Sequence, residues 1–136
     1  MRLLPLVLSL AAALLIAACS DDTDDDLEDP RRGRVGGVAE LAVGAYASAG
    51  PEALADYMSQ DALGQCSVEE LVEALADETA PTGFRQLKGV DFDGETAEAV
   101  IIISTREGER DVVWTYVEED GNWRISDMPG LENCPS

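Results

Sequence analysis

Three short turns between strand-like segments constrain the fold of this chain more than any other feature of its sequence. They lie at Asp93-Gly94, within residues 106–110 and at residues 120–122. Asp-Gly is typical of a two-residue β-hairpin, and connections this short leave no room for the crossover that parallel strands require. The C-terminal half is therefore predicted to fold as a four-stranded antiparallel meander.

The four predicted strands differ in their apolar patterns. Residues 96–105 form a nearly continuous apolar run, which is typical of a strand buried on both faces. In residues 84–92, Leu87 and Val90 break the alternation, which predicts a β-bulge near Gly89. Residues 111–119 and 123–128 alternate regularly. Their inward side chains are expected to be Val112, Trp114, Tyr116, Trp123 and Ile125.

Helices are predicted before the strands. A first helix begins near Val35 and ends at Gly50, because glycine commonly follows a helix C-cap. Pro51 suits the first position of a second, short helix. Helical spacing predicts the buried faces to be Val38, Leu41, Ala42, Ala45 and Ala49 in the first helix, and Leu54, Tyr57 and Met58 in the second.

A third helix is predicted after Ser67. Ser67 and Glu70 have the spacing of a capping box, in which each side chain accepts a hydrogen bond from the backbone of the other. The apolar stripe behind this cap is expected to be Val68, Leu71, Val72 and Leu75.

Helices followed by an antiparallel meander define an α+β fold, with N-terminal helices packed on one face of a four-stranded sheet. The segment DGNWRISDM, residues 120–128, is similar to the last strand of the nuclear transport factor 2-like (cystatin-like) superfamily, which many small exported bacterial proteins belong to. The resemblance is one of pattern and spans about residues 35–130. It implies a curved sheet that wraps its helices into a cone, and a cone pocket that serves some members as isomerases, dehydratases or cyclases.

The N-terminus has the pattern of an export signal. Arg2 precedes an apolar run over residues 3–18, which is shorter than the ~20 residues of a membrane span and typical of a signal peptide. Ile16-Ala17-Ala18-Cys19 resembles the lipobox of bacterial lipoproteins. This resemblance implies that residues 1–18 are a cleaved signal peptide and that Cys19 is the lipid-modified N-terminus. An ordinary secretory signal with an incidental cysteine is the alternative.

Residues 19–34 are interpreted as an acidic, disordered tether to a single domain over residues 35–136, since one apolar residue among so many acids cannot form a core. Asp22, Asp24 and Asp26 have the start of an EF-hand pattern, but Leu27 and Gly33 occupy the positions that require glycine and glutamate. No calcium site is therefore predicted.

The charge balance excludes several classes of function. The formal net charge is −19, with 28 acidic and 9 basic residues, which argues against nucleic acid and anionic lipid as binding surfaces. The chain has no histidine, so the commonest general base and metal ligand are missing. We expect no metal and no cofactor.

Cys66 and Cys134 remain as an even pair once Cys19 is modified. Exported proteins meet oxidising surroundings, so the two are expected to form a disulfide. The alternative is a nucleophilic or metal-binding thiol, for which the sequence supplies no histidine partner.

The predicted inner face of the sheet contains the candidate pocket residues: Phe84, Phe92, Trp114, Tyr116, Trp123 and Asp127. These aromatic side chains either pack into an ordinary core or line a ligand cavity. Asp127 shares the alternation of Trp123 and Ile125, so it is the candidate base of an isomerase-like enzyme. The alternative is that Asp127 caps the turn that follows it.

The sequence therefore predicts a lipid-anchored, extracytoplasmic binding module of the bacterial envelope without catalytic activity. Its expected partner is an envelope protein. Alternatives are a carrier of a small apolar molecule, a dehydratase-like or isomerase-like enzyme, and a homodimer that pairs through the exposed sheet.

Overall fold

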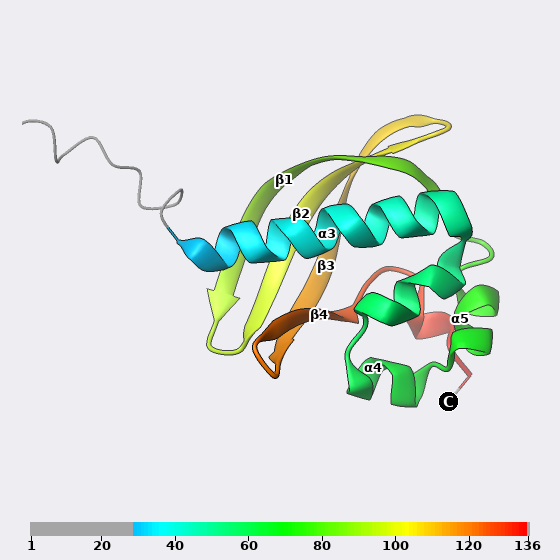
Figure 1. Ribbon diagram of the computed structural model, residues 1–136. Helices are drawn as coiled ribbons and strands as arrows, with labels where there is room; N and C mark the ends of the chain where they lie inside the picture. The colour runs from blue at the N-terminus through cyan, green and yellow to red at the C-terminus, as the bar shows by residue number, and fades with distance from the viewer. Residues whose placement is uncertain (1–28, 136) are drawn as a thin grey trace, which may run out of the picture. The chain divides into compact units, whose positions relative to one another are not determined.

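A computed structural model describes residues 29–135 of the protein, which form helices followed by one antiparallel sheet (Figure 1). This arrangement confirms the predicted α+β fold. In chain order the elements are α3 (Pro30–Ala49), η2 (Pro51–Tyr57), α4 (Gln60–Gln65), α5 (Val68–Ala74), β1 (Pro81–Asp93), β2 (Thr96–Thr105), β3 (Gly108–Glu119), β4 (Asn122–Asp127) and η3 (Leu131–Asn133).

The sheet is a meander in which neighbouring strands follow each other in sequence, in the order β1-β2-β3-β4. All three pairings are antiparallel, as the short turns predicted. The first turn lies one residue later than expected, because Asp93 pairs with Thr96 and leaves Gly94 and Glu95 in the turn. Gly94 has a φ of 62°, a conformation that glycine adopts without steric cost.

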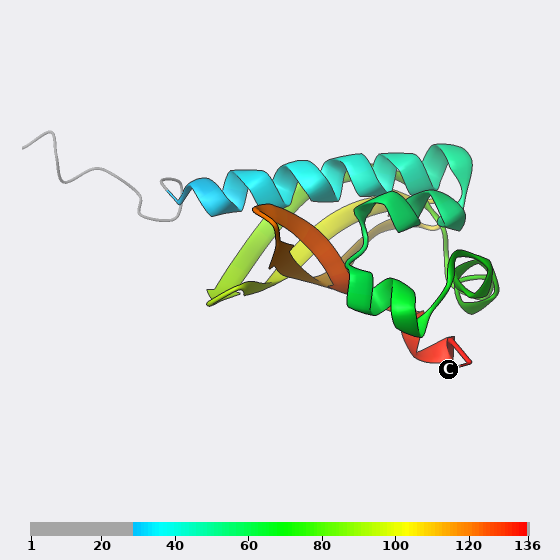
Figure 2. The ribbon, with the colours of Figure 1, turned by 60° about the horizontal axis from the view of Figure 1, so that its bottom comes forward.

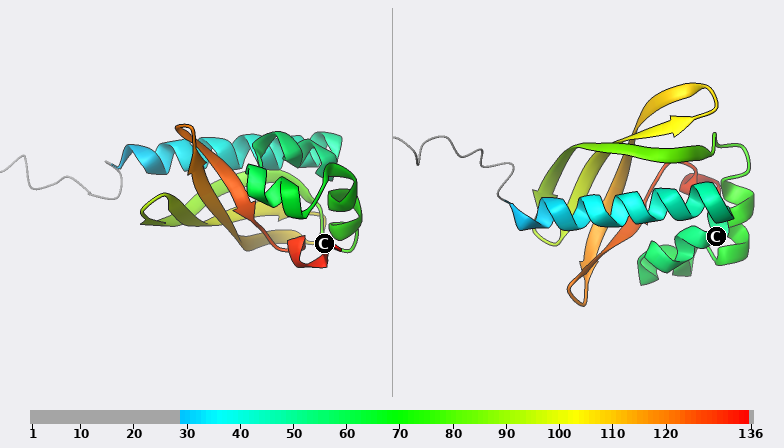
Figure 3. Two further views of the ribbon diagram at one scale, coloured as in Figure 1. Left: turned by 90° about the horizontal axis from the view of Figure 1, so that it is seen from below. Right: turned by 45° about the horizontal axis from the view of Figure 1, so that its top comes forward.

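β1 is the most irregular strand. Its register against β2 shifts at three places, one of them between Leu87 and Gly89, which confirms the predicted bulge. Bulges bend a strand and increase its twist, and the sheet curves around α3 (Figures 2 and 3).

The prediction that β2 is buried on both faces is wrong. Its residues alternate between buried and partly exposed, so that Ile101 and Ile103 lie in the core while Val100 and Ile102 are only half-buried. The reason is that the described helices all lie on one side of the sheet or beyond its end (Figure 3). Among residues 29–135, only the face toward α3 is therefore covered.

The predicted core face of α3 is confirmed at Ala42, and Val38 packs against the core, but the prediction is wrong at Leu41 and Ala49, which are exposed. The buried residues of this helix are Val35, Ala39, Ala42, Val43 and Tyr46, whereas Leu41 is 61 % exposed. Small and apolar residues surround this helix on most sides, so hydropathy alone did not separate its faces. Contact with the sheet selects the side that carries Val43 and Tyr46.

α3 begins at Pro30, before the position that we expected. Residues 30–34, which we expected to belong to the disordered tether, therefore form the start of this helix. Proline is favoured at the first helical position. Two arginines fix this end to β1: the Arg31 guanidinium lies 4.1 Å from the centre of the Phe92 ring, and Arg32 donates to the Leu87 carbonyl at 3.4 Å.

The short helices were predicted in part. Gly50 ends α3, and η2 follows from Pro51. The capping box before α5 is confirmed, because Ser67 and Glu70 exchange hydrogen bonds of 2.9 and 3.2 Å. The expected stripe of α5 is wrong at two positions, Val68 and Val72, which are exposed. α4 was not predicted.

Candidate functional site

The interior of the curved sheet is filled by side chains. Trp114, Tyr116 and Trp123 are at most 3 % exposed and lie in the core with Ile125. Phe84 and Phe92 are half-buried at its edge, where Phe92 packs against Trp123 with ring centres 5.5 Å apart. The structure thus brings together the aromatic residues that the sequence singled out, and it places them in a packed core.

A small cavity remains at one end of this core. Its volume is about 40 Å³, and its walls include Tyr46, Trp114 and Met128. Drug-sized ligands occupy sites of about 300–1,000 Å³, so this cavity accommodates a few water molecules at most. Burial, and to a lesser extent Glu78, raises the pKa of Tyr46 beside it.

Two buried donors in the core have no hydrogen-bond partner among the described residues. They are the Tyr116 hydroxyl and the Trp123 indole N–H. Burial raises the pKa of Tyr116 well above its usual value, so this hydroxyl stays protonated at neutral pH. Neither group is poised for proton transfer.

Asp127 does not reach this interior. β4 contains one extra residue between the pairs Tyr116–Ile125 and Thr115–Asp127, and this irregularity breaks the alternation on which the prediction rested. Asp127 is exposed, and its Oδ1 accepts a hydrogen bond of 3.0 Å from the Met128 backbone N–H. The carboxylate therefore bonds to the turn that follows β4, which is the alternative we gave for it.

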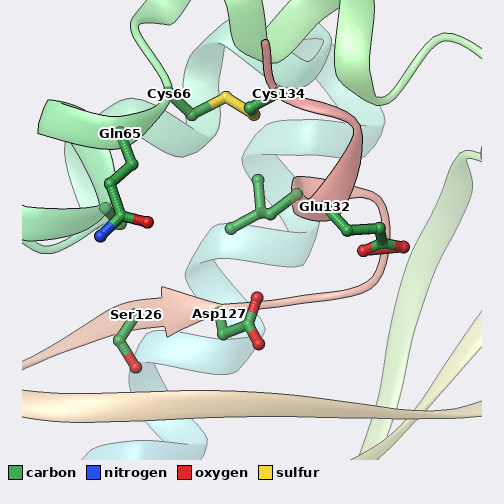
Figure 4. A pocket seen from close by; sticks show the side chains of 8 residues that line it. Gln65, Cys66, Ser126, Asp127, Glu132 and Cys134 are labelled. Carbon is green, nitrogen blue, oxygen red and sulfur yellow. A yellow bond between two sulfur atoms is a disulfide. The ribbon is translucent and has the colours of Figure 1, made fainter. Parts of the chain in front are cut away.

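A larger concavity lies outside the core, between α4, η3 and the end of β4 (Figure 4). We call it the disulfide groove; its volume is about 500 Å³. It is lined by Ala62, Gln65, Cys66, Ser126, Asp127, Leu131, Glu132 and Cys134.

The predicted disulfide between Cys66 and Cys134 is confirmed and forms part of this wall. It joins residues 68 apart in sequence and brings η3 against the helical layer. Asn133 supports the same contact, because its side-chain amide donates to the Ala74 carbonyl at 3.2 Å. The segment after β4 is therefore held in place as one side of the groove.

The two carboxylates of the groove are oriented by backbone groups. Both oxygens of Glu132 accept from the Gly130 N–H, at 3.1 and 3.2 Å, and Asp127 is held by Met128. No cluster of three or more metal-ligating side chains forms among residues 29–135. The groove therefore offers negative charge and hydrogen-bond acceptors, which suit an ammonium or guanidinium group.

Sequence reasoning identified Asp127 and both cysteines of this groove but missed Gln65 and Glu132. These two residues lie far apart in sequence, and the fold-back of the C-terminal segment brings them to one surface. The pairing of Cys66 with Cys134 was the one clue in the sequence that the segments around them meet.

The predicted lipidation site Cys19, the signal peptide and most of the tether lie outside the described residues. Within residues 29–135, no helix is both long and apolar enough to cross a membrane.

No protein-family model matches the sequence, and no curated protein matches it. Among solved structures, the chain is similar to a DUF4783 family protein from Bacteroides ovatus, with 14 % identity, a TM-score of 0.43, and coverage of 64 % of this chain and 87 % of that chain.

Proposed function

We propose that this protein is a non-catalytic binding module, anchored by lipid at Cys19 to the extracytoplasmic face of a bacterial membrane. Its disulfide groove receives a cationic part of an envelope protein. The domain is a variant of the nuclear transport factor 2-like cone in which the interior serves as core and not as a pocket.

One contrast carries this proposal. The interior holds a cavity of about 40 Å³, whereas the groove on the outside measures about 500 Å³ and presents two carboxylates. A carrier or an isomerase-like enzyme needs the opposite arrangement, with space inside and a carboxylate aimed into it. Asp127 is exposed instead.

The anchor is tested by replacing its acceptor. Wild-type protein is expected in the membrane fraction of cells, and Cys19→Ser in the soluble or secreted fraction, because a stable anchor needs more than one acyl chain and all of them depend on this residue. Equal membrane association of both proteins would remove the lipid anchor from the proposal.

The groove is tested by a photo-crosslinking side chain at Gln65, which is exposed on α4 and lines the groove. The matched control carries the same group at Ser48, which is exposed on α3. In cells, Gln65 is expected to give one discrete product that Glu132→Gln weakens, and Ser48 none. Identical products from both positions, or no product from Gln65, would contradict a groove-bound partner.

A further inference from the structure

The outer face of the sheet is left bare by the described helices (Figures 1 and 3). Strand pairing arranges its side chains in rows that run across the strands. The pairs Asp91–Glu98, Glu98–Thr115 and Thr115–Asp127 make one continuous row over all four strands. We call it the acidic row, after its three carboxylates.

The acidic row is electrostatically unfavourable as it stands. Asp91 and Glu98 lie directly opposite each other on β1 and β2, and like charges at such positions destabilise a sheet. Both side chains are exposed, and neither forms an ion pair with another described residue. Asp127, separated from Glu98 by Thr115, ends the row at the edge of the disulfide groove, so the two features share this carboxylate.

Next to the acidic row lies an apolar row on the same face. Gly89, Val100 and Val113 are paired across β1, β2 and β3. Val113 is 44 % exposed, and nothing lies within 4 Å of the position that a side chain on Gly89 would take. The apolar row is therefore open to a partner.

On the other side of the apolar row, acidic side chains of β3 form ion pairs with basic side chains of β1. Lys88 pairs with Asp111 at 2.7 Å and Arg85 with Glu109 at 2.9 Å. The unpaired negative charge next to the apolar row therefore lies in the acidic row, and the exposed Asp93 adds to it two residues further along β1. Arg124, in the row beyond, donates a hydrogen bond to the Asp56 carbonyl. The charge pattern is complementary to a surface that places cations beside apolar side chains.

We propose that the outer face of the sheet docks a segment of the partner protein that carries a row of Lys or Arg side chains beside a row of apolar ones. This inference rests on the proposed function and names the partner's chemistry. Strands lie about 4.8 Å apart, so the acidic row is roughly 15 Å long, which matches about ten residues of an amphipathic helix. The partner's cations lie on the acidic row and continue into the groove at Asp127.

A second copy of the chain is the poorer occupant. Each copy has a net charge of −19, and two acidic rows that meet face to face repel each other. A cationic partner instead neutralises the Asp91–Glu98 pair.

The probe for this proposal is a short, fluorescently labelled amphipathic helix of leucine and lysine. Binding to the full-length chain in phosphatidylcholine nanodiscs is measured by anisotropy, with empty nanodiscs as the blank. Matched peptides of leucine with glutamate and of serine with lysine are expected to bind more weakly. Higher ionic strength is expected to weaken the leucine–lysine peptide, since these charges are exposed.

Two pairs of variants locate the binding. Glu98→Gln is expected to raise the Kd about two- to fivefold, the range of one exposed ion pair; the control is Glu40→Gln on α3. Val113→Thr is expected to raise the Kd about threefold through the loss of one buried methyl group; the control is Val72→Thr, where the side chain is 40 % exposed. Both controls are expected to bind as the wild type does.

Equal effects of Glu98→Gln and Glu40→Gln would overturn the proposal, because binding would then follow net charge alone. A wild-type dimer that Val113→Thr dissociates, with no loss of peptide binding, would assign the face to a second copy and also overturn it. A yield of the Gln65 crosslink that is unchanged in both Glu98→Gln and Val113→Thr would leave the groove as a site while removing the outer face. Loss of the Gln65 product itself is the separate failure of the proposed function.

Discussion

The alternation of apolar and polar residues along a strand does not always predict which face of the sheet a side chain lies on. Trp123 and Ile125 point inward as their spacing predicted, yet Asp127, two residues further on, does not. The extra residue in β4 reverses its side, and no local sequence feature marks that irregularity. By contrast, the bulge at Gly89 was predictable, because the apolar residues on both sides of it break step in the sequence.

Tyr116 allows the packed core to be tested at one atom. Its hydroxyl is buried without a partner among the described residues, so Tyr116→Phe removes an unsatisfied polar group. The free energy of unfolding is expected to stay equal or to rise, by up to about 2 kcal/mol, in urea denaturation at neutral pH. A loss of more than about 1 kcal/mol would contradict this and mean that the hydroxyl has an acceptor, such as a buried water.

Tyr116→Phe is also expected to change how the free energy of unfolding depends on pH under alkaline conditions. Burial raises the pKa of Tyr116 in the folded state, whereas the unfolded chain ionises near the ordinary value of about 10. The unfolded state therefore binds fewer protons above that pH, and stability falls as pH rises. Below about pH 10 this effect is absent. Tyr116→Phe is expected to show a shallower decline, measured by urea denaturation across that range.

At the scale of elements, local signals predicted well and contacts between elements did not. The bounds of β2, the turns and the capping box of α5 depend on a few neighbouring residues, and all were close to the structure. The buried face of α3 depends on which side meets the sheet. α4 was missed because a helix of 6 residues has too few positions for a recognisable period.

The N-cap of α4 shows how such a short helix is stabilised. Ser59 is fully buried. The Ser59 hydroxyl accepts a hydrogen bond from the Ala62 backbone N–H at 3.1 Å. The Ser59 backbone N–H donates to the Ile125 carbonyl of β4 at 2.8 Å. Ser59→Ala leaves a buried N–H without a partner and is expected to lower the free energy of unfolding by about 1–2 kcal/mol.

The matched control is Ser67→Ala, which removes the corresponding cap of α5 at an exposed position. Water replaces the lost hydrogen bond there, so the loss is expected to be smaller, about 0.5–1 kcal/mol. Urea denaturation of both variants gives the comparison. A larger loss in Ser67→Ala would show that burial does not decide the strength of these caps.

At the scale of the whole molecule, the site depends on segments that are distant in sequence. The groove forms where the disulfide brings the C-terminal segment back to α4, and the acidic row forms where four strands align. The sequence could predict the strands and the cysteine pair separately. It could not predict the row, because strand register sets which carboxylates become neighbours.

A filled interior favours a binding module, and an interior with free space favours a ligand carrier. A larger side chain at Ala39 distinguishes the two. Ala39 is fully buried on α3, facing the sheet. In a packed core the added side chain of Ala39→Leu has no space, so the free energy of unfolding is expected to fall by about 1–3 kcal/mol. Ala47→Leu makes the same change at an exposed position of the same helix, where an effect within about 0.5 kcal/mol is expected. Chemical denaturation measures both. An Ala39→Leu variant as stable as the wild type would mean that the interior has room, and the apolar-ligand carrier would become the better proposal.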